Sequence, residues 1–175
     1  MHYIKLALIS FIFLFLVVTG ISLFFPSNVT ILRAVNIKTG KDSVMSQLSN
    51  PANWKKWYPG LDNAQLLSAN GATNGVFVNA KDSTRPITIL IDKKEADQVI
   101  TSFSGANYKK IAGGWRVTEY STRDSVLVEW YMNFHLRWYP WEKFSSLLLD
   151  KTYGSRMQQG LNNLKMLLQK ESDED

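Results

Sequence analysis

The chain has 175 residues, a formal net charge of +5 and no cysteine. Without cysteine a lipoprotein anchor is excluded, and two histidines cannot supply a usual zinc site. The lysines form scattered pairs rather than a basic stripe, and no phosphate-binding glycine motif is present, so we expect no nucleic acid, metal or other cofactor.

An almost unbroken apolar run, Leu6 to Phe25, opens the chain. A helix rises about 1.5 Å per residue, so about 20 residues cross a hydrocarbon core of roughly 30 Å. Lys5 before the run would suit either a membrane anchor or a signal peptide. The run is long for a signal peptide and has no small-residue cleavage site at its end, so we favour an uncleaved anchor. An atypical signal peptide is the alternative.

The residues that flank this run also bear on orientation and on domain limits. Three basic residues follow it (Arg33, Lys38 and Lys41). Because basic residues that flank a span favour the cytoplasmic side, they weakly favour a cytoplasmic position for the rest of the chain. We predict an anchor with a short joint over 1–28, one domain over 29–170, and a solvated acidic tail over 171–175. About 150 residues is an ordinary size for a single domain.

The domain is predicted to begin with a strand and two short helices. Residues 29–37 alternate between apolar and polar, with Arg33 breaking the apolar face. Arg33 could bind a ligand carboxylate or phosphate, but we favour a strand-edge or bulge position with its head in water. Helical patterns follow at 41–48 and from Pro51, where Trp54 and Trp57 share a face that we assign to the core.

A run of strands separated by turn-prone residues comes next. Two Asn-Gly pairs, at 70–71 and 74–75, favour turns, and Gly113-Gly114 precedes another strand. The predicted strands cover 65–68, 76–79, 87–92, 99–103, 115–120 and 125–136. The last of these is the clearest, because its strict alternation is typical of an antiparallel strand with one wet face. His135 falls on the polar face, which favours a surface histidine over a general base.

A long helix over 141–169 is predicted to close the domain. Its apolar residues fall at helical spacing, but Gly154 and Gly160 interrupt it at a cost of about 1 kcal/mol each relative to alanine. Close approach to a sheet, or a kink, would explain them. Before this helix stand Trp138, Tyr139 and Trp141, which could edge a ligand portal, rest among lipid headgroups, or seal a hydrophobic corner.

Two segments resemble the START/Bet v 1-like (SRPBCC, polyketide cyclase-like) superfamily. The first is VNIKTGKDSVMSQLSNPANWKKWYPG at 35–60, and the second is DKTYGSRMQQGLNNLKMLL at 150–168. The resemblance implies an α+β helix-grip fold, in which a curved antiparallel sheet holds a long C-terminal helix. It further implies a cavity for an apolar or amphipathic ligand. The superfamily has no universal catalytic set, so it implies no catalytic residue here.

We therefore predict a membrane-anchored domain that binds a hydrophobic small molecule or lipid. Candidate cavity-lining residues are Trp130, Met132, Phe134 and Leu148, which would otherwise fill a core. Two alternatives remain open. A cyclase- or hydrolase-like enzyme would need an ionisable group inside the cavity, and no catalytic constellation is visible. A membrane-tethered interaction module would have its cavity filled by side chains.

Overall fold

The computed structural model describes residues 2–69, 71–78, 86–105, 108–120 and 125–173. In chain order the elements are α1 (His2–Ser22), β1 (Asn28–Ile37), α2 (Lys41–Ser49), α3 (Pro51–Trp54), β2 (Gln65–Ala69), β3 (Ala72–Val78), β4 (Ile87–Lys94), β5 (Gln98–Gly105), β6 (Tyr108–Glu119), β7 (Val126–His135), α4 (Pro140–Leu149), η1 (Asp150–Gly154) and α5 (Ser155–Asp173).

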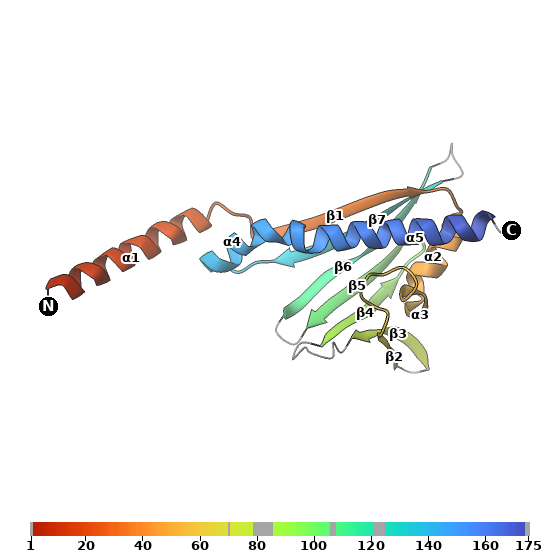
Figure 1. Ribbon diagram of the computed structural model, residues 1–175, viewed down its shortest axis with the longest axis horizontal. Coiled ribbons are helices and arrows are strands. Elements are labelled where there is room, and N and C mark those ends of the chain that lie inside the picture. The colour runs from red at the N-terminus through yellow and green to blue at the C-terminus, as the bar shows by residue number, and fades with distance from the viewer. Residues whose placement is uncertain (1, 70, 79–85, 106–107, 121–124, 174–175) are drawn as a thin grey trace.

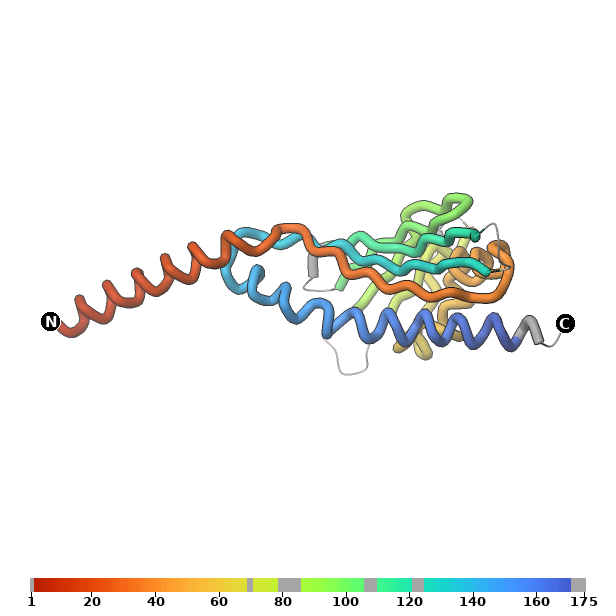
Figure 2. Tube along the Cα trace, turned by 90° about the horizontal axis from the view of Figure 1, so that it is seen from above, coloured from red at the N-terminus to blue at the C-terminus, as the bar shows by residue number. Residues whose placement is uncertain are grey.

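The seven strands form one antiparallel sheet in the order β1-β7-β6-β5-β4-β3-β2. The sheet curves, and α5 runs along it, while α2 and α3 lie at the end distant from α1 (Figure 1). Seen from above, α5 lies beside β1, β7 and β6 and runs along them (Figure 2). The α+β helix-grip fold predicted from sequence is confirmed.

The buried face of the sheet follows from the alternation of β1 and β7. Residues from Val126 to Phe134 at even positions are buried, and those between them are half-buried or exposed. β1 pairs with β7 in one continuous register, with Ile31 opposite Met132. β1 is an edge strand, as predicted, but the Arg33 head is not simply in water. Its Nη2 lies 2.6 Å from Oδ1 of Asp150.

Three glycines that we expected outside strands lie inside them. Gly75 is in β3 and Gly113 and Gly114 are in β6, which begins at Tyr108 rather than at Trp115. A Cβ on Gly113 would lie 2.7 Å from the Tyr131 carbonyl oxygen, and one on Gly75 would overlap the Ile89 carbonyl. These glycines therefore permit close approach of neighbouring strands, whereas Gly71, with φ 80°, occupies a true turn. Asn70 and Asn79 lie outside the described residues.

The predicted C-terminal helix is confirmed, but it contains one wider turn. Between α4 and α5, residues 150–154 form the π-helical turn η1. Such turns bend or re-aim a helix, and this one re-aims α4 relative to α5. α5 continues to Asp173, so the first three residues of the predicted tail are helical, and 174–175 lie outside the described residues.

Four tryptophans form the centre of the core at the α2–α3 end. Trp54, Trp57, Trp115 and Trp130 are at most 3% exposed, and the ring centroids of Trp115 lie 5.3–5.6 Å from those of the other three. The prediction that Trp54 and Trp57 pack in the core is confirmed. Tilted and edge-on rings at these distances add to the stabilisation from burial.

The N-terminal helix α1 stands away from the domain (Figure 1). It has 21 residues and is long and apolar enough to cross a membrane, a property that signal sequences share. Its most apolar stretch is not buried by the rest of the protein.

Candidate functional site

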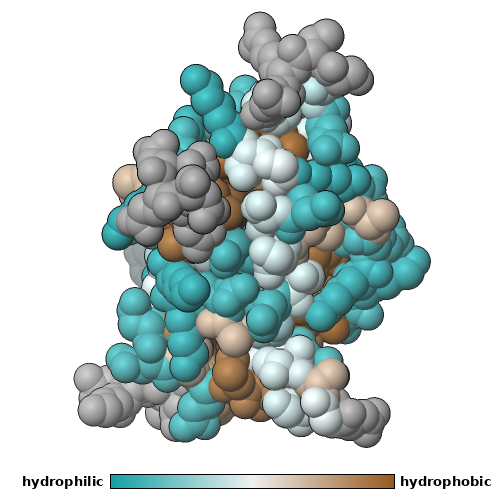
Figure 3. Space-filling view, turned by 90° about the vertical axis from the view of Figure 1, so that its right-hand side faces the viewer, coloured by the Kyte–Doolittle hydropathy of each residue, from teal (hydrophilic) through white to brown (hydrophobic). Residues whose placement is uncertain are grey.

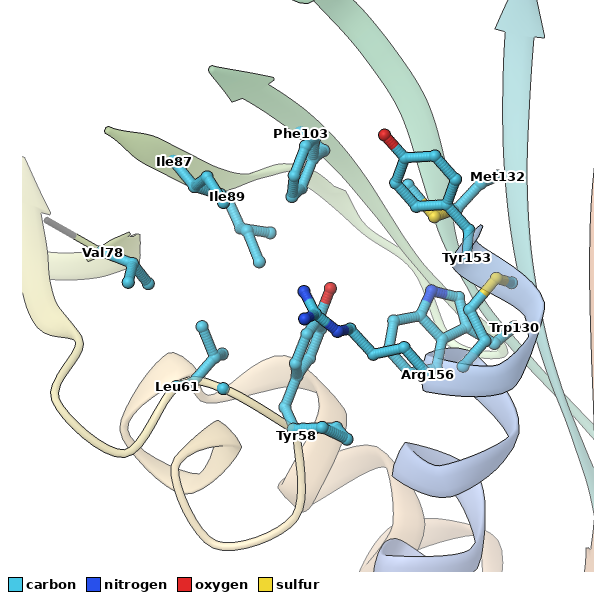
Figure 4. Close-up of a pocket in the computed structure, with 13 residues that line it drawn as sticks. Tyr58, Leu61, Val78, Ile87, Ile89, Phe103, Trp130, Met132, Tyr153 and Arg156 are labelled. Carbon is cyan, nitrogen blue, oxygen red and sulfur yellow. The ribbon is translucent and has the colours of Figure 1, made fainter. Parts of the chain in front are cut away.

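An apolar pocket of about 50 Å³ lies between the sheet, the segment after α3, and the start of α5. Side chains from β3, β4 and β5 form one wall, and Trp130 and Met132 of β7 with Met157 of α5 form the other (Figure 4). The strands place these residues because even positions of β7 face the helix. The apolar walls would favour a hydrophobic ligand or ligand part.

Two polar groups enter this apolar pocket. The hydroxyl of the half-buried Tyr58 and the guanidinium of the exposed Arg156 both point towards its middle (Figure 4). Burial among aromatic rings raises the pKa of Tyr58, and the nearby Arg156 partly opposes this. Tyr58 is therefore a neutral hydrogen-bond donor at ordinary pH. Within the described residues, no carboxylate lies within 4.0 Å of Arg156.

A larger groove of about 710 Å³ opens at the other end of the sheet, beside α4. Its apolar lining includes Val29, Phe134, Leu136 and Leu149, and charged and polar side chains also line it. This volume lies in the range of small-molecule sites, roughly 300–1,000 Å³, whereas the inner pocket alone is far below it.

Tyr153 lies between the two cavities and lines both. Its ring centroid is 5.0 Å from that of Phe134, which lines only the groove. Tyr153 belongs to η1, where the widened turn sets its position.

The four predicted lining residues do not all line the same cavity. Trp130 and Met132 line the inner pocket, and Phe134 lines the groove. Leu148 is 62% exposed and lines neither cavity, while the next residue, Leu149, lines the groove. One residue turns a helix by about 100°, so a small error in the facing of α4 exchanges the two. The ligand contacts of all four remain predictions.

Sequence reasoning missed Tyr58, Tyr153 and Arg156. The signal for the last two was present, because 153, 156, 157 and 160 share one side of a helix, and this side faces the sheet at Gly160. Tyr58 follows Trp57 in an irregular segment, where no periodicity indicates which way a side chain points.

The ionisable groups elsewhere form no evident catalytic set in the described part of the chain. His135 is exposed, as predicted, and its Nδ1 lies 2.7 Å from Asn28 Oδ1. Glu129 lies 3.6 Å from Arg116 rather than near His135. No group of three or more metal-ligating side chains occurs among the residues searched, which are the described ones.

A curved sheet around a long helix, with cavities between them, defines a START-like helix-grip protein. The chain belongs to the family described as polyketide cyclase / dehydrase and lipid transport, which it matches over residues 29–169. No curated protein sequence matches the chain.

Solved structures agree on the fold at low sequence identity. A START superfamily protein from Mycobacterium smegmatis is 14% identical, with a TM-score of 0.63 over 81% of this chain and 97% of its own. A protein from Nitrosospira multiformis is also 14% identical, with a TM-score of 0.61 over 83% and 99%. CalU16 from Micromonospora echinospora is 15% identical, with a TM-score of 0.52 over 79% and 73%.

Proposed function

We propose that the domain binds an amphipathic small molecule or lipid that carries an anionic group. The observation that carries this proposal is the inner pocket, where the exposed residue Arg156, without an acidic partner in the described residues, lies beside largely apolar walls. A carboxylate or phosphate would pair with the Arg156 guanidinium and accept a hydrogen bond from Tyr58. Burial of the apolar part would supply roughly 25 cal/mol per Å² removed from water.

The small inner volume sets a condition on this binding. A pocket of about 50 Å³ holds only a few heavy atoms, so a lipid-sized ligand must also occupy the groove. We propose that Tyr153 turns to join the two cavities. Trp130 and Met132 would then contact one part of the ligand and Phe134 another. A ligand that stays in the groove alone would not depend on Arg156.

The test compares a fluorescent fatty acid with its methyl ester, using the full chain in lipid nanodiscs. Arg156→Gln should weaken binding of the acid about tenfold or more, corresponding to about 1.4 kcal/mol, and leave the ester unchanged. The control is Lys151→Gln, which removes an exposed cation of η1 that lines neither cavity. Equal binding of acid and ester, or equal effects of both substitutions, would contradict the proposal that Arg156 binds an anionic group of the ligand.

We further propose that α1 stays in the mature protein and holds the domain at a membrane. Its length of 21 residues, its largely apolar composition and its separation from the domain support this proposal. Carbonate extraction should leave the protein in the membrane pellet, with an intact N-terminus by mass. A soluble product beginning near residue 26 would instead identify the segment as a signal peptide.

A further inference from the structure

Large apolar side chains are exposed at the end of the domain nearest α1. Trp138, Trp141, Leu147 and Leu148 are each 58–64% exposed, and all come from α4 or the turn before it. The rings of Tyr139 and Trp141 stack 4.9 Å apart and nearly parallel. The hydrophobic corner considered from sequence is thus not sealed by the domain. By contrast, the opposite end of the molecule is predominantly hydrophilic (Figure 3).

This surface, here called the α4 corner (Trp138–Leu148), is fixed to the end of α1. The Lys143 side chain is buried, and its ammonium donates to the Phe25 carbonyl at 3.0 Å and to Ser27 Oγ at 2.7 Å. The rings of Phe25 and Phe144 meet edge-to-face at 5.3 Å. Both views place the turn before α4 beside the last part of α1 (Figures 1 and 2).

We infer that the α4 corner lies in the interfacial region of the same bilayer that α1 crosses. This inference rests on the proposed anchoring by α1. Tryptophan and tyrosine favour the headgroup level, and an amphipathic helix such as α4 buries its apolar side at that depth. The Lys143 contacts hold the corner where α1 would leave the hydrocarbon, so the patch is continuous with an apolar surface already in lipid.

The larger groove lies next to the α4 corner. Leu149 and Glu142 of α4 line the groove, so the groove opens beside the corner. With the corner in the bilayer, an apolar molecule passes between lipid and groove while its exposure to water stays small.

The test uses the absence of cysteine, which makes every introduced thiol unique. Spin labels are attached to full-length Trp141→Cys, Leu148→Cys, Met166→Cys and Phe13→Cys variants in nanodiscs. Met166 is the matched control, because it is 62% exposed on α5. Labels at 141 and 148 should collide more with oxygen, which concentrates in lipid, than with a water-soluble nickel chelate. The label at 166 should show the reverse preference.

Three other outcomes would overturn the inference. If the labels at 141 and 148 behave like the label at 166 while the label at 13 reports lipid, α1 is in the membrane but the α4 corner does not contact it. If 13 also reports water, the anchoring proposal fails and the docking falls with it. If 141 and 148 are immobilised and shielded from both reagents, a protein partner rather than lipid covers the corner.

Discussion

Gly160 of α5 lies so close to Trp130 of β7 that a Cβ at position 160 would be 2.7 Å from Trp130 Cζ3 and 3.1 Å from Pro59 Cδ. Trp130 is buried among other rings and cannot easily move away. This contact places the long helix against Trp130, which lines the inner pocket. It explains a glycine in mid-helix by close approach, one of the two reasons expected from sequence.

Gly160→Ala should therefore destabilise the fold. The gain in helix propensity is about 1 kcal/mol, but overpacking in a filled core costs about 1–3 kcal/mol. We expect the overpacking cost to exceed the gain in helix propensity, so the thermal midpoint of the full chain in detergent should fall. Gln159→Ala, at the exposed neighbouring position, should leave the midpoint unchanged or raise it. A higher midpoint for Gly160→Ala would mean that Trp130 yields freely.

Gly154→Ala should act through the ion pair of Arg33 and Asp150. A Cβ at 154 would overlap the guanidinium, with Arg33 Cζ only 2.9 Å away. The guanidinium is the end of a flexible side chain that is 29% exposed, so the loss should be modest, about 1 kcal/mol or less. In an Arg33→Ala background the same substitution should become neutral or stabilising. Equal costs in both backgrounds would rule out this coupling.

Much of the fold was predictable from sequence, because it depends on patterns that local physics enforces. The alternation of β7 predicts which of its side chains face the helix. The helical spacing of the apolar residues over 141–169 likewise predicts one buried side, on which Leu161 and Leu164 are fully buried. Glycines 75 and 113 were misassigned because a glycine that permits close strand packing looks identical to one that permits a turn.

The site was less predictable, since it depends on where distant segments meet. Tyr58, Tyr153 and Met132 are brought together only by the closed fold. The π-helical turn rotates the residues before it about the helix axis relative to the residues after it. A regular helical pattern continued back to Leu148 and Leu149 therefore predicts the wrong side of the helix for these two residues.

Tyr58→Phe should reduce the loss of stability at alkaline pH. Because burial raises the folded-state pKa of Tyr58 above its ordinary 10.0, the unfolded chain ionises first as pH rises. The stability that neutral Tyr58 contributes is therefore fully present below its ordinary pKa, and it is lost as the pH rises towards the raised pKa of the folded state. Urea unfolding at about pH 9 and about pH 11 should show a smaller difference for the variant than for wild type. Tyr120→Phe, at an exposed tyrosine, should keep the wild-type difference.

His135→Gln should leave stability and ligand binding unchanged. The imidazole is exposed at the groove rim, and its contact is to the surface residue Asn28. Glutamine keeps a polar group of similar length there. Thermal melts and binding titrations of the two proteins should coincide. A well-folded variant that selectively loses turnover of any substrate would favour the enzyme interpretation instead.

The most direct test of a ligand-binding interior is to fill it. Met132→Trp adds apolar volume inside the pocket, at an overpacking cost of about 1–3 kcal/mol that a melt will report. Met166→Trp makes the same chemical change at an exposed position of α5. Titration of the full chain in nanodiscs with a fluorescent fatty acid should show saturable binding by wild type and Met166→Trp, and at least tenfold weaker binding by a folded Met132→Trp protein. Absence of wild-type binding across a broad lipophilic panel, or equal binding by both variants, would contradict the ligand-binding account and favour an interaction module with a filled interior.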